Sequence, residues 1–185
     1  MIIKRIKLEN YTVFEDHQIE FDPGINIFIG ENGTGKTHLF KVLYSACQCV
    51  DQRVSFSHKL VSTMLPDDYK ISRLITRKQG NRSALIRIFA GERDVTQERV
   101  LSASFHGKTK KWDAEVTGEK GWDEPESNIN PSYISIIVEL LLELQRKGVQ
   151  VFVSTHDYMI ASYFEVRKTK NDSIAFHSLS HASKS

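Results

Sequence analysis

The sequence predicts an α/β fold with a mixed central sheet, flanking helices and an additional antiparallel β lobe. Three observations support this fold class. Residues 30–37 form a glycine-rich segment between a short apolar strand pattern and a helical pattern. Residues 149–153 form a second apolar strand pattern after a predicted helix. The stretch 51–120 carries short strand patterns separated by glycines, which is typical of a small antiparallel sheet.

The length of 185 residues is that of one domain with a sizeable core. We expect a single domain over residues 1–180, in which 1–50 and 122–180 form the core and 51–120 form the β lobe. Residues 181–185 are polar and are expected to be a loose tail.

The composition excludes some classes of protein. A net charge of +2 gives no global electrostatic reason to bind nucleic acid or an anionic membrane. The chain has no run of 18 apolar residues and no apolar signal segment at its start. We therefore expect a cytoplasmic protein that binds no membrane. Cys47 and Cys49 are expected to be buried or half-buried free thiols, which suits a reducing compartment.

Three strand patterns precede the glycine-rich segment. Met1–Glu9 alternates apolar and basic side chains, and His17–Phe21 places Ile19 and Phe21 on one side. The string Asp22-Pro23-Gly24 predicts a turn. Ile25–Ile29, which follows it, is short, mostly apolar and rich in β-branched residues, as a buried strand would be.

The segment Gly30-Glu31-Asn32-Gly33-Thr34-Gly35-Lys36-Thr37 fits the phosphate-binding pattern of glycine, four residues, glycine, lysine and serine or threonine. Its glycines let backbone N–H groups turn toward phosphate oxygens, Lys36 reaches the terminal phosphates, and the Thr37 hydroxyl can bind Mg²⁺. A helix predicted over His38–Cys49 points its positive end at the anion. The expected nucleotide-binding residues are Gly30, Glu31, Asn32, Gly33, Thr34, Gly35, Lys36, Thr37 and His38.

The middle of the chain predicts strands at residues 72–76, 84–90, 100–105 and 111–116. Its other feature is a basic cluster without any acidic residue, made of Lys70, Arg73, Arg77, Lys78, Arg82 and Arg87. Such a cluster is either a solvated sheet face or a surface for nucleic acid or an acidic partner. No aromatic residues are interleaved with it, so a platform for base stacking is missing.

A second chemical motif lies in the string Trp122-Asp123-Glu124-Pro125-Glu126. The first of two adjacent carboxylates can hold Mg²⁺, and the second can orient and deprotonate an attacking water. Asn130 can cap a helix expected over residues 131–147. The strand 149–153 then ends in a segment containing His156, at the edge of an open α/β sheet where ligands bind. A short helix over 157–164 and a strand over 173–179 are expected to follow.

These strings resemble a known family. The opening of the ABC-type ATPase heads of the SMC, RecF and OLD group resembles the segments Ile6–Tyr11, Phe14, Ile19–Phe21 and Gly24–Asn26 that lead into Gly30–Thr37. Asp123–Glu126 resembles the Walker B motif, Ser127–Asn130 the D-loop, and His156 the switch histidine that senses the γ-phosphate.

The resemblance implies an ATPase head that binds ATP with Mg²⁺, which Thr37 and Asp123 would hold. Glu124, His156 and Lys36 would be the catalytic residues. Such heads close on ATP with a second copy or a partner head, and hydrolysis then acts as a conformational switch. They serve in DNA repair, chromosome maintenance and phage defence, so DNA or an accessory nuclease or effector protein is an expected partner.

Two parts of the family pattern are missing before Trp122. Residues 117–121 are unsuited to the buried strand that normally precedes such carboxylates, and no Ser-Gly-rich signature segment occurs between Asp51 and Gly121. Either a segment is missing near 117–121, or another element replaces the strand. Two alternative functions remain: a nucleotide-binding interaction module without hydrolysis, and a DNA-binding ATPase that uses the basic cluster. An adenylate-kinase-type phosphotransferase would leave the carboxylates and His156 unexplained.

Overall fold

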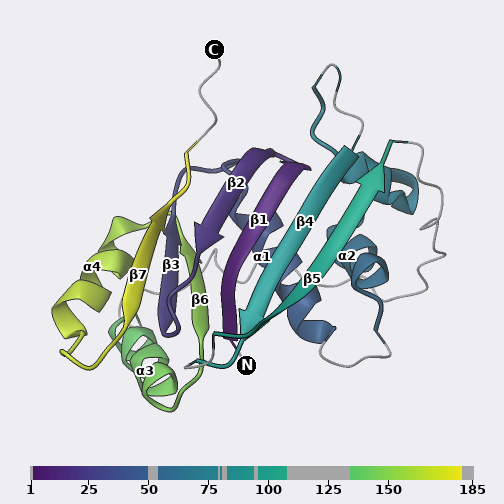
Figure 1. Ribbon diagram of the computed structural model, residues 1–185. Coiled ribbons are helices and arrows are strands. Elements are labelled where there is room, and N and C mark those ends of the chain that lie inside the picture. Colours follow the sequence, from purple (N-terminus) through teal and green to yellow (C-terminus); the bar gives the residue numbers. More distant parts are fainter. Residues whose placement is uncertain are drawn as a thin grey trace. The chain divides into compact units, whose positions relative to one another are not determined.

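The computed structural model describes residues 2–49, 54–78, 80, 83–93, 96–107 and 134–180. Internal contacts divide these residues into two compact units. The first unit contains residues 2–21 and the described residues from 35 to 107, and the second contains residues 22–34 and 134–180. Figure 1 shows the elements of both units.

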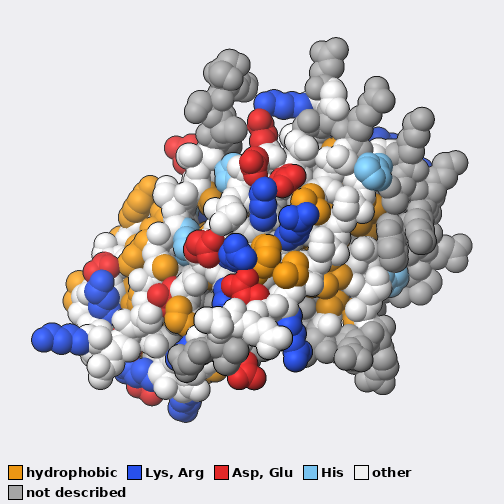
Figure 2. Space-filling view, viewed as in Figure 1, with side chains coloured by type: hydrophobic (Ala, Val, Ile, Leu, Met, Phe, Trp, Pro, Cys, Tyr) orange, Lys and Arg blue, Asp and Glu red, His pale blue; other side chains and the backbone are white. Residues whose placement is uncertain are grey.

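The first unit is built on a four-stranded antiparallel sheet in the order β2, β1, β4, β5 (Figure 1). Its strands are β1 (Ile2–Tyr11), β2 (Phe14–Glu20), β4 (Ser83–Gly91) and β5 (Glu98–His106). Alternate apolar side chains, among them Ile6, Leu8 and Ile86, are buried on one face, as the two-residue period of a strand requires. The other face carries charged residues of β1 and β2, and Figure 2 shows acidic and basic side chains interspersed there.

Two helices belong to the first unit, α1 (Lys36–Gln48) and α2 (Phe56–Met64), and they contact each other. α1 buries Leu39, Val42 and Leu43, which share one helix face because they are three and four residues apart. Two 3₁₀ helices, Asp67–Tyr69 and Ile71–Leu74, follow α2.

The second unit is built on a three-stranded parallel sheet in the order β6, β3, β7 (Figure 1). Its strands are β3 (Ile25–Ile29), β6 (Val151–Thr155) and β7 (Ile174–Ser178). Ile29 lies opposite both Thr155 and Ser178, so the three strands end together at one edge, which we call the carboxyl edge. α3 (Ile134–Arg146) leads into β6, and α4 (Tyr158–Arg167) connects β6 to β7.

The core of the second unit holds α3 and α4 on the parallel sheet. Ile25 and Ile27 of β3 cluster with Val138 and Leu142 of α3 and with Phe164 of α4. Val138 and Leu142 are four residues apart and therefore face the sheet together. Because burial of an apolar side chain of this size stabilises a protein by about 1.5–3 kcal/mol, these contacts fix the helices that flank the carboxyl edge.

A buried polar network lies around the start of the parallel strands. The Asn26 side chain donates to the Asp22 carbonyl oxygen and accepts from the Asp22 N–H, both at 2.8 Å. Asn26 Oδ1 also lies 3.0 Å from His177 Nε2. An amide oxygen can only accept, so this nitrogen of His177 carries the proton. Ser173 Oγ donates to Asp22 Oδ2 at 2.8 Å, which ties the start of β7 to the turn before β3.

Most of the predicted elements are confirmed with shifts of a few residues at their ends. β6 begins and ends two residues later than the predicted strand 149–153, and α4 continues to Arg167. The predicted strand 111–116 and the start of the helix predicted from 131, with its cap Asn130, lie outside the described residues. None of the described helices is both long and apolar enough to cross a membrane.

In the first unit two predictions are wrong, and one helix was missed. Residues 72–76 do not form a strand: Ile71–Leu74 is a 3₁₀ helix, and Ile75 makes one isolated bridge with Tyr11. Ile71 and Leu74 are both buried, and their spacing of three places them on one side of a 3₁₀ turn. Helix α2 was not predicted. Cys47 is an exposed free thiol, whereas Cys49 is half-buried as expected, because the two side chains lie on different sides of α1.

Candidate functional site

The glycine-rich segment begins directly after β3, at the carboxyl edge. A Cβ atom at Gly30 would lie 2.3 Å from the Leu179 carbonyl oxygen. This close approach is fixed by the Leu179 N–H, which donates to the Ile29 carbonyl oxygen at 2.9 Å. A side chain at position 30 would push the end of β7 away from β3, so glycine is required there.

Residues 31–34 form a turn that keeps its backbone at the surface. The buried Thr34 side chain donates from Oγ1 to the Glu31 carbonyl oxygen at 2.9 Å. Gly33 adopts φ 83°, a conformation that glycine reaches without a steric cost. Glu31, Asn32 and Gly33 are exposed. A turn of this kind can present backbone N–H groups to an anion.

Gly35 starts helix α1 in a left-handed conformation, with φ 97°. A Cβ atom here would lie 2.6 Å from both Phe14 Cζ and Val13 Cγ2, at the tip of the β1–β2 hairpin. No side chain caps the start of α1, and its first turn has no acidic residue. The positive end of the helix is thus not neutralised by a cap, as an anion site requires.

The three predicted binding residues after Gly35 lie on the first turn of α1. Lys36 and His38 are half-buried, and Thr37 is exposed. Burial lowers the pKa of His38, and the positive charge of Lys41 lowers it further. The His38 Nδ1 atom is buried without a hydrogen-bond partner among the described residues. The neutral imidazole of His38 adds no charge to the first turn of α1. Lys36 supplies the positive charge of that turn.

His156 lies where β6 turns into α4. Thr155 Oγ1 accepts the Asp157 N–H at 2.9 Å, and Asp157 Oδ1 accepts the Met159 N–H at 2.8 Å. The second bond caps the start of α4. These two bonds fix the backbone on both sides of His156 and leave its side chain exposed.

The second unit brings part of the predicted site together. Ile29 pairs with Thr155, so the residues that follow them, Gly30 and His156, leave adjacent parallel strands at the same edge. Neighbouring strands are about 4.8 Å apart, which places the start of the phosphate-binding segment beside the predicted switch histidine. This is the ligand-binding edge of open α/β sheets.

The other half of the predicted chemistry lies outside the described residues, because Asp123 and Glu124 fall between 107 and 134. Among the described residues, no group of three or more His, Cys, Asp or Glu side chains could hold a metal ion. The exposed Thr37 hydroxyl fits one position of the expected Mg²⁺ ligand set. The carboxylate of that set would have to come from Asp123.

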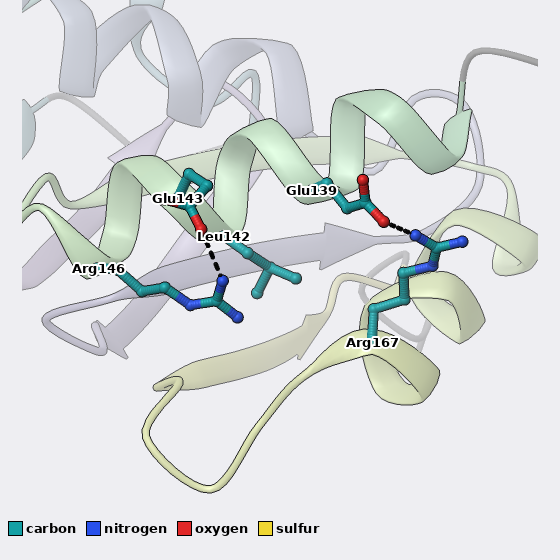
Figure 3. A pocket seen from close by; sticks show the side chains of 5 residues that line it. All are labelled: Glu139, Leu142, Glu143, Arg146 and Arg167. Atoms are coloured by element: carbon teal, nitrogen blue, oxygen red, sulfur yellow. Dashed lines mark hydrogen bonds and ion pairs between the residues drawn. The ribbon is translucent and has the colours of Figure 1, made fainter.

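A pocket of about 330 Å³ lies between α3 and α4 (Figure 3), away from the candidate site. Its charged residues pair with one another, Arg146 with Glu143 at 2.8 Å and Arg167 with Glu139. Arg146 and Arg167 end the two helices that lead into β6 and β7. The pocket therefore lies toward the starts of these strands, not toward the carboxyl edge.

Carboxylates accompany the basic cluster of residues 70–87. Lys70 and Arg73 lie 3.3 Å and 3.6 Å from Asp68, and Lys78 lies 2.6 Å from Glu15. Arg87 is exposed on β4, and Arg82 lies outside the described residues. Asp68 lies two residues before Lys70, the first residue of the cluster. The local positive charge is therefore lower than the sequence from Lys70 to Arg87 indicates by itself.

Sequence reasoning missed two contacts that shape the phosphate-binding segment. The Leu179 carbonyl oxygen fixes Gly30, and Phe14 fixes Gly35. In the sequence Phe14 belongs only to a family pattern, and its contact with Gly35 joins residues far apart in the chain. No local signal in the sequence could have indicated either contact.

Comparison with known proteins adds three sequence relatives, each named DNA replication and repair protein RecF. The relative from Streptococcus agalactiae is 34% identical over 88 residues, which are 48% of this chain and 24% of the relative. The relative from Clostridium kluyveri is 35% identical over 89 residues, which are 48% of this chain and 24% of the relative. The relative from Phocaeicola vulgatus is 47% identical over 49 residues, which are 26% of this chain and 13% of the relative. The chain thus spans at most about a quarter of the length of these relatives.

Two solved structures are distantly similar. A RecF recombination mediator with ATP matches 56% of this chain and 23% of its own, with 18% identity and a TM-score of 0.38. An SMC head bound to the C-winged helix domain of ScpA matches 57% of this chain and 32% of its own, with 18% identity and a TM-score of 0.42.

A protein-family model matches a larger part of the chain. The model of the family described as AAA domain matches residues 5–180, which include the phosphate-binding segment, the carboxylate pair and His156. The chain therefore belongs to the AAA domain family.

Proposed function

We propose that this chain binds ATP with Mg²⁺ and hydrolyses it when two heads close on the nucleotide. The observation that carries the proposal is the convergence of Gly30–Thr34 and His156 at one edge of the parallel sheet. A phosphate-binding turn and an imidazole on adjacent strands suit a triphosphate whose terminal phosphate reaches the histidine.

Each residue of the candidate site has a defined part in this proposal. Backbone N–H groups of Gly30–Gly35 bind the phosphate oxygens, and the Lys36 ammonium neutralises their negative charge. Glu124 accepts a proton from the attacking water, and His156 contacts the γ-phosphate or that water. Thr37 and Asp123 hold Mg²⁺, which lowers the charge of the phosphates when it is bound.

The test is the substitution Glu124→Gln, with Glu126→Gln as the matched control two residues away. A glutamine at 124 keeps the shape of the side chain but accepts no proton. ATP binding should therefore remain, while turnover falls by about 10²-fold or more. Glu126→Gln should turn over like the wild type. Equal turnover in Glu124→Gln and the wild type would remove Glu124 from the mechanism.

A nucleotide-binding module without hydrolysis is the second candidate function, because no signature segment occurs in the sequence. The steady-state ATPase rate at several protein concentrations separates the two candidates. A rate that rises more than linearly with concentration supports an enzyme that acts as a dimer. ATP binding without turnover at every concentration supports the module.

The names of the RecF relatives concern DNA replication and repair, and we propose that the chain works in DNA repair, chromosome maintenance or phage defence. Direct DNA binding is the weaker part of this proposal, because Asp68 and Glu15 pair with the basic cluster. If the cluster binds DNA, the affinity should fall steeply with salt. Binding that is indifferent to salt would contradict this role.

A further inference from the structure

The tip of the β1–β2 hairpin, residues 10–14, carries two unfavourable backbone conformations. Asn10 and Thr12 have φ angles of 49° and 51°, in the left-handed region that residues with a side chain seldom adopt. The cost is larger for Thr12, because its side chain branches at Cβ. The Thr12 hydroxyl is also buried without a hydrogen-bond partner among the described residues. Other contacts must therefore hold the tip in this conformation.

Residues 74–76, which are distant in the sequence, supply such contacts through their backbone. The Thr12 N–H donates to the Leu74 carbonyl oxygen at 2.8 Å, and the Thr76 N–H donates to the Asn10 carbonyl oxygen at 2.9 Å. Each of these bonds joins a residue with a positive φ to the same short segment. We call residues 74–76 the supporting segment.

The supporting segment is itself fixed in the core of the first unit. Ile75 makes the isolated bridge with Tyr11, and both side chains are buried. Leu74 and Ile71, at the two ends of the preceding 3₁₀ helix, are buried as well. Because these side chains cannot move without opening a close-packed core, the segment can hold a strained hairpin in place.

One side chain of the supporting segment also bonds to the hairpin tip. The Thr76 hydroxyl donates from Oγ1 to the Phe14 carbonyl oxygen at 3.3 Å. Phe14 is the residue that approaches Gly35, since a Cβ atom at Gly35 would lie 2.6 Å from Phe14 Cζ and from Val13 Cγ2. A continuous series of contacts thus leads from Thr76 through Phe14 to Gly35, all within the first unit.

Gly35 determines how helix α1 begins. Its carbonyl oxygen accepts the Leu39 N–H at 2.9 Å, at the start of the helix. The position of Gly35 therefore sets where the backbone N–H groups and the side chains of Lys36 and Thr37 point. A binding site for phosphate depends on such groups being held in place before the ligand arrives.

We infer that Thr76 is a positioning residue for nucleotide binding. Through Phe14 it holds the hairpin tip in the position that fixes Gly35 and the start of α1 for the phosphates. Thr76 acts through these residues and has no contact with the nucleotide in this role. The inference rests on the proposed function, because it concerns the ATP-binding segment, and it adds a residue that lies far outside the motif in the sequence.

Amide hydrogen exchange without nucleotide tests the positioning directly. Thr76→Val keeps the shape of the side chain and removes the hydroxyl, so the Leu39 N–H, which bonds to Gly35, should exchange about threefold faster or more. Thr76→Ser keeps the hydroxyl and should exchange like the wild type. The Lys59 N–H, which donates to the Ser55 carbonyl oxygen at the start of α2, is the internal reference and should keep its rate in both variants.

Calorimetric titration with ATP and Mg²⁺ tests the consequence for binding. We expect about threefold weaker ATP binding or more in Thr76→Val, and wild-type affinity in Thr76→Ser. A purely structural role would lower the melting temperature and leave the affinity of the folded chain unchanged. The titrations are therefore done well below the melting temperature of each variant, where the chain is folded.

Four results would overturn the inference. One is an unchanged rate of the Leu39 N–H in Thr76→Val. Another is an equal acceleration of the Lys59 N–H, which would indicate a general loss of stability. Equal behaviour of Thr76→Ser and Thr76→Val would show that the hydroxyl is not the cause. Faster exchange with unchanged ATP affinity would limit Thr76 to a structural role.

A failure of the proposed function gives a different result. If the wild type binds no ATP, the proposed function is overturned together with the role of Thr76 in nucleotide binding. The exchange rates are measured without nucleotide, so they would still decide whether Thr76 positions Gly35.

Discussion

The glycines of the phosphate-binding segment are fixed by different neighbours. Gly30 meets the backbone after β7, and Gly35 meets Phe14 and Val13. Gly35 also has a positive φ, which an L-residue reaches at a cost of about 1–2 kcal/mol. At this position two requirements coincide, since both the backbone conformation and the space exclude a side chain.

Gly35→Ala is therefore expected to be more destabilising than a positive φ alone explains. The alanine Cβ would lie 2.6 Å from two side chains at the hairpin tip, so the hairpin or the start of α1 must shift. We expect a loss of about 2 kcal/mol or more in the free energy of unfolding and at least tenfold weaker ATP binding. Urea unfolding and calorimetric titration measure the two effects.

Gly80→Ala is the matched control for this substitution. Gly80 also has a positive φ, 93°, but nothing lies within 4 Å of its would-be Cβ. Its replacement should cost about 1 kcal/mol through backbone strain alone and leave ATP binding unchanged. If both variants lose the same stability, the contact of Gly35 with Phe14 has no energetic role.

His177 makes the stability of the protein depend on pH. Its ring stacks on Phe28, with centroids 4.5 Å apart, and its Nε2 donates to Asn26. Burial lowers the pKa of His177 below its usual 6.5, although the nearby Asp22 partly opposes this. The unfolded chain therefore takes up the proton first. Stability is present above about pH 6.5 and is lost as the pH falls toward the lower pKa of the folded state.

His177→Gln should flatten this dependence, because glutamine can still donate to Asn26 but does not titrate. The free energy of unfolding of the wild type, measured by urea from about pH 7.5 to 5, should fall more steeply than that of the variant. His38 also has a lowered pKa and contributes in both proteins. Parallel curves would show that His177 does not take up a proton on unfolding.

At the scale of elements, the carboxylate of Asp172 joins the loop before β7 to α3. The Asp172 side chain is fully buried and accepts two bonds from Arg146, both at 2.9 Å. It also accepts the Thr169 N–H at 2.8 Å. The bonds from Arg146 hold the pKa of Asp172 at about 2, helped by those from Thr169. Asp172 thus fixes the C-terminal end of α3 to the loop that leads into β7.

Asp172→Asn should loosen this connection, because an amide cannot match both the guanidinium and the Thr169 N–H. We expect a loss of about 1–2 kcal/mol at neutral pH, measured by urea unfolding. Glu165→Gln, in the exposed pair with Lys168, is the control and should change stability by less than about 0.5 kcal/mol. The difference between the two variants should shrink as acid protonates Asp172, from about pH 4 downward.

The sequence predicted elements well where one pattern dominates. β3 has its predicted bounds, because a short β-branched run after an Asp-Pro-Gly turn leaves few alternatives. α2 was missed, although Phe56, Leu60 and Val61 are buried at helical spacing. β-branched and polar residues in this helix weaken its intrinsic propensity. Burial of the apolar side chains therefore determines that this segment is helical. The helical spacing of these side chains in the sequence would have been enough to predict α2.

The sequence proposes the residues of the candidate site but not their geometry. The motif located Gly30–Thr37, and the order of strand and polar residue located His156. That Gly30 and His156 leave adjacent strands depends on the pairing of β3 with β6, which are far apart in the chain. Pairing of this kind is set by the packing of α3 on the sheet, and no local pattern records it.

For the whole molecule, the division into two units falls inside the phosphate-binding segment, between Thr34 and Gly35. Gly30 to Thr34 belong to the unit with the parallel sheet, and Gly35 to Thr37 belong to the unit with the antiparallel sheet. Neither unit contains the whole motif. The motif is therefore whole only in the intact chain.

A ligand that binds only the folded chain must raise its stability, and this gives the last prediction. ATP at about a hundred times its dissociation constant should add about 2.7 kcal/mol, or roughly 5–10 °C in melting temperature for a chain of this size. Lys36→Ala removes the motif lysine and should abolish the shift. Lys41→Ala, on the same helix but outside the motif, should keep it. An equal shift in Lys36→Ala and the wild type would mean that ATP binds elsewhere, because no other residue of the motif supplies a positive charge to the phosphates.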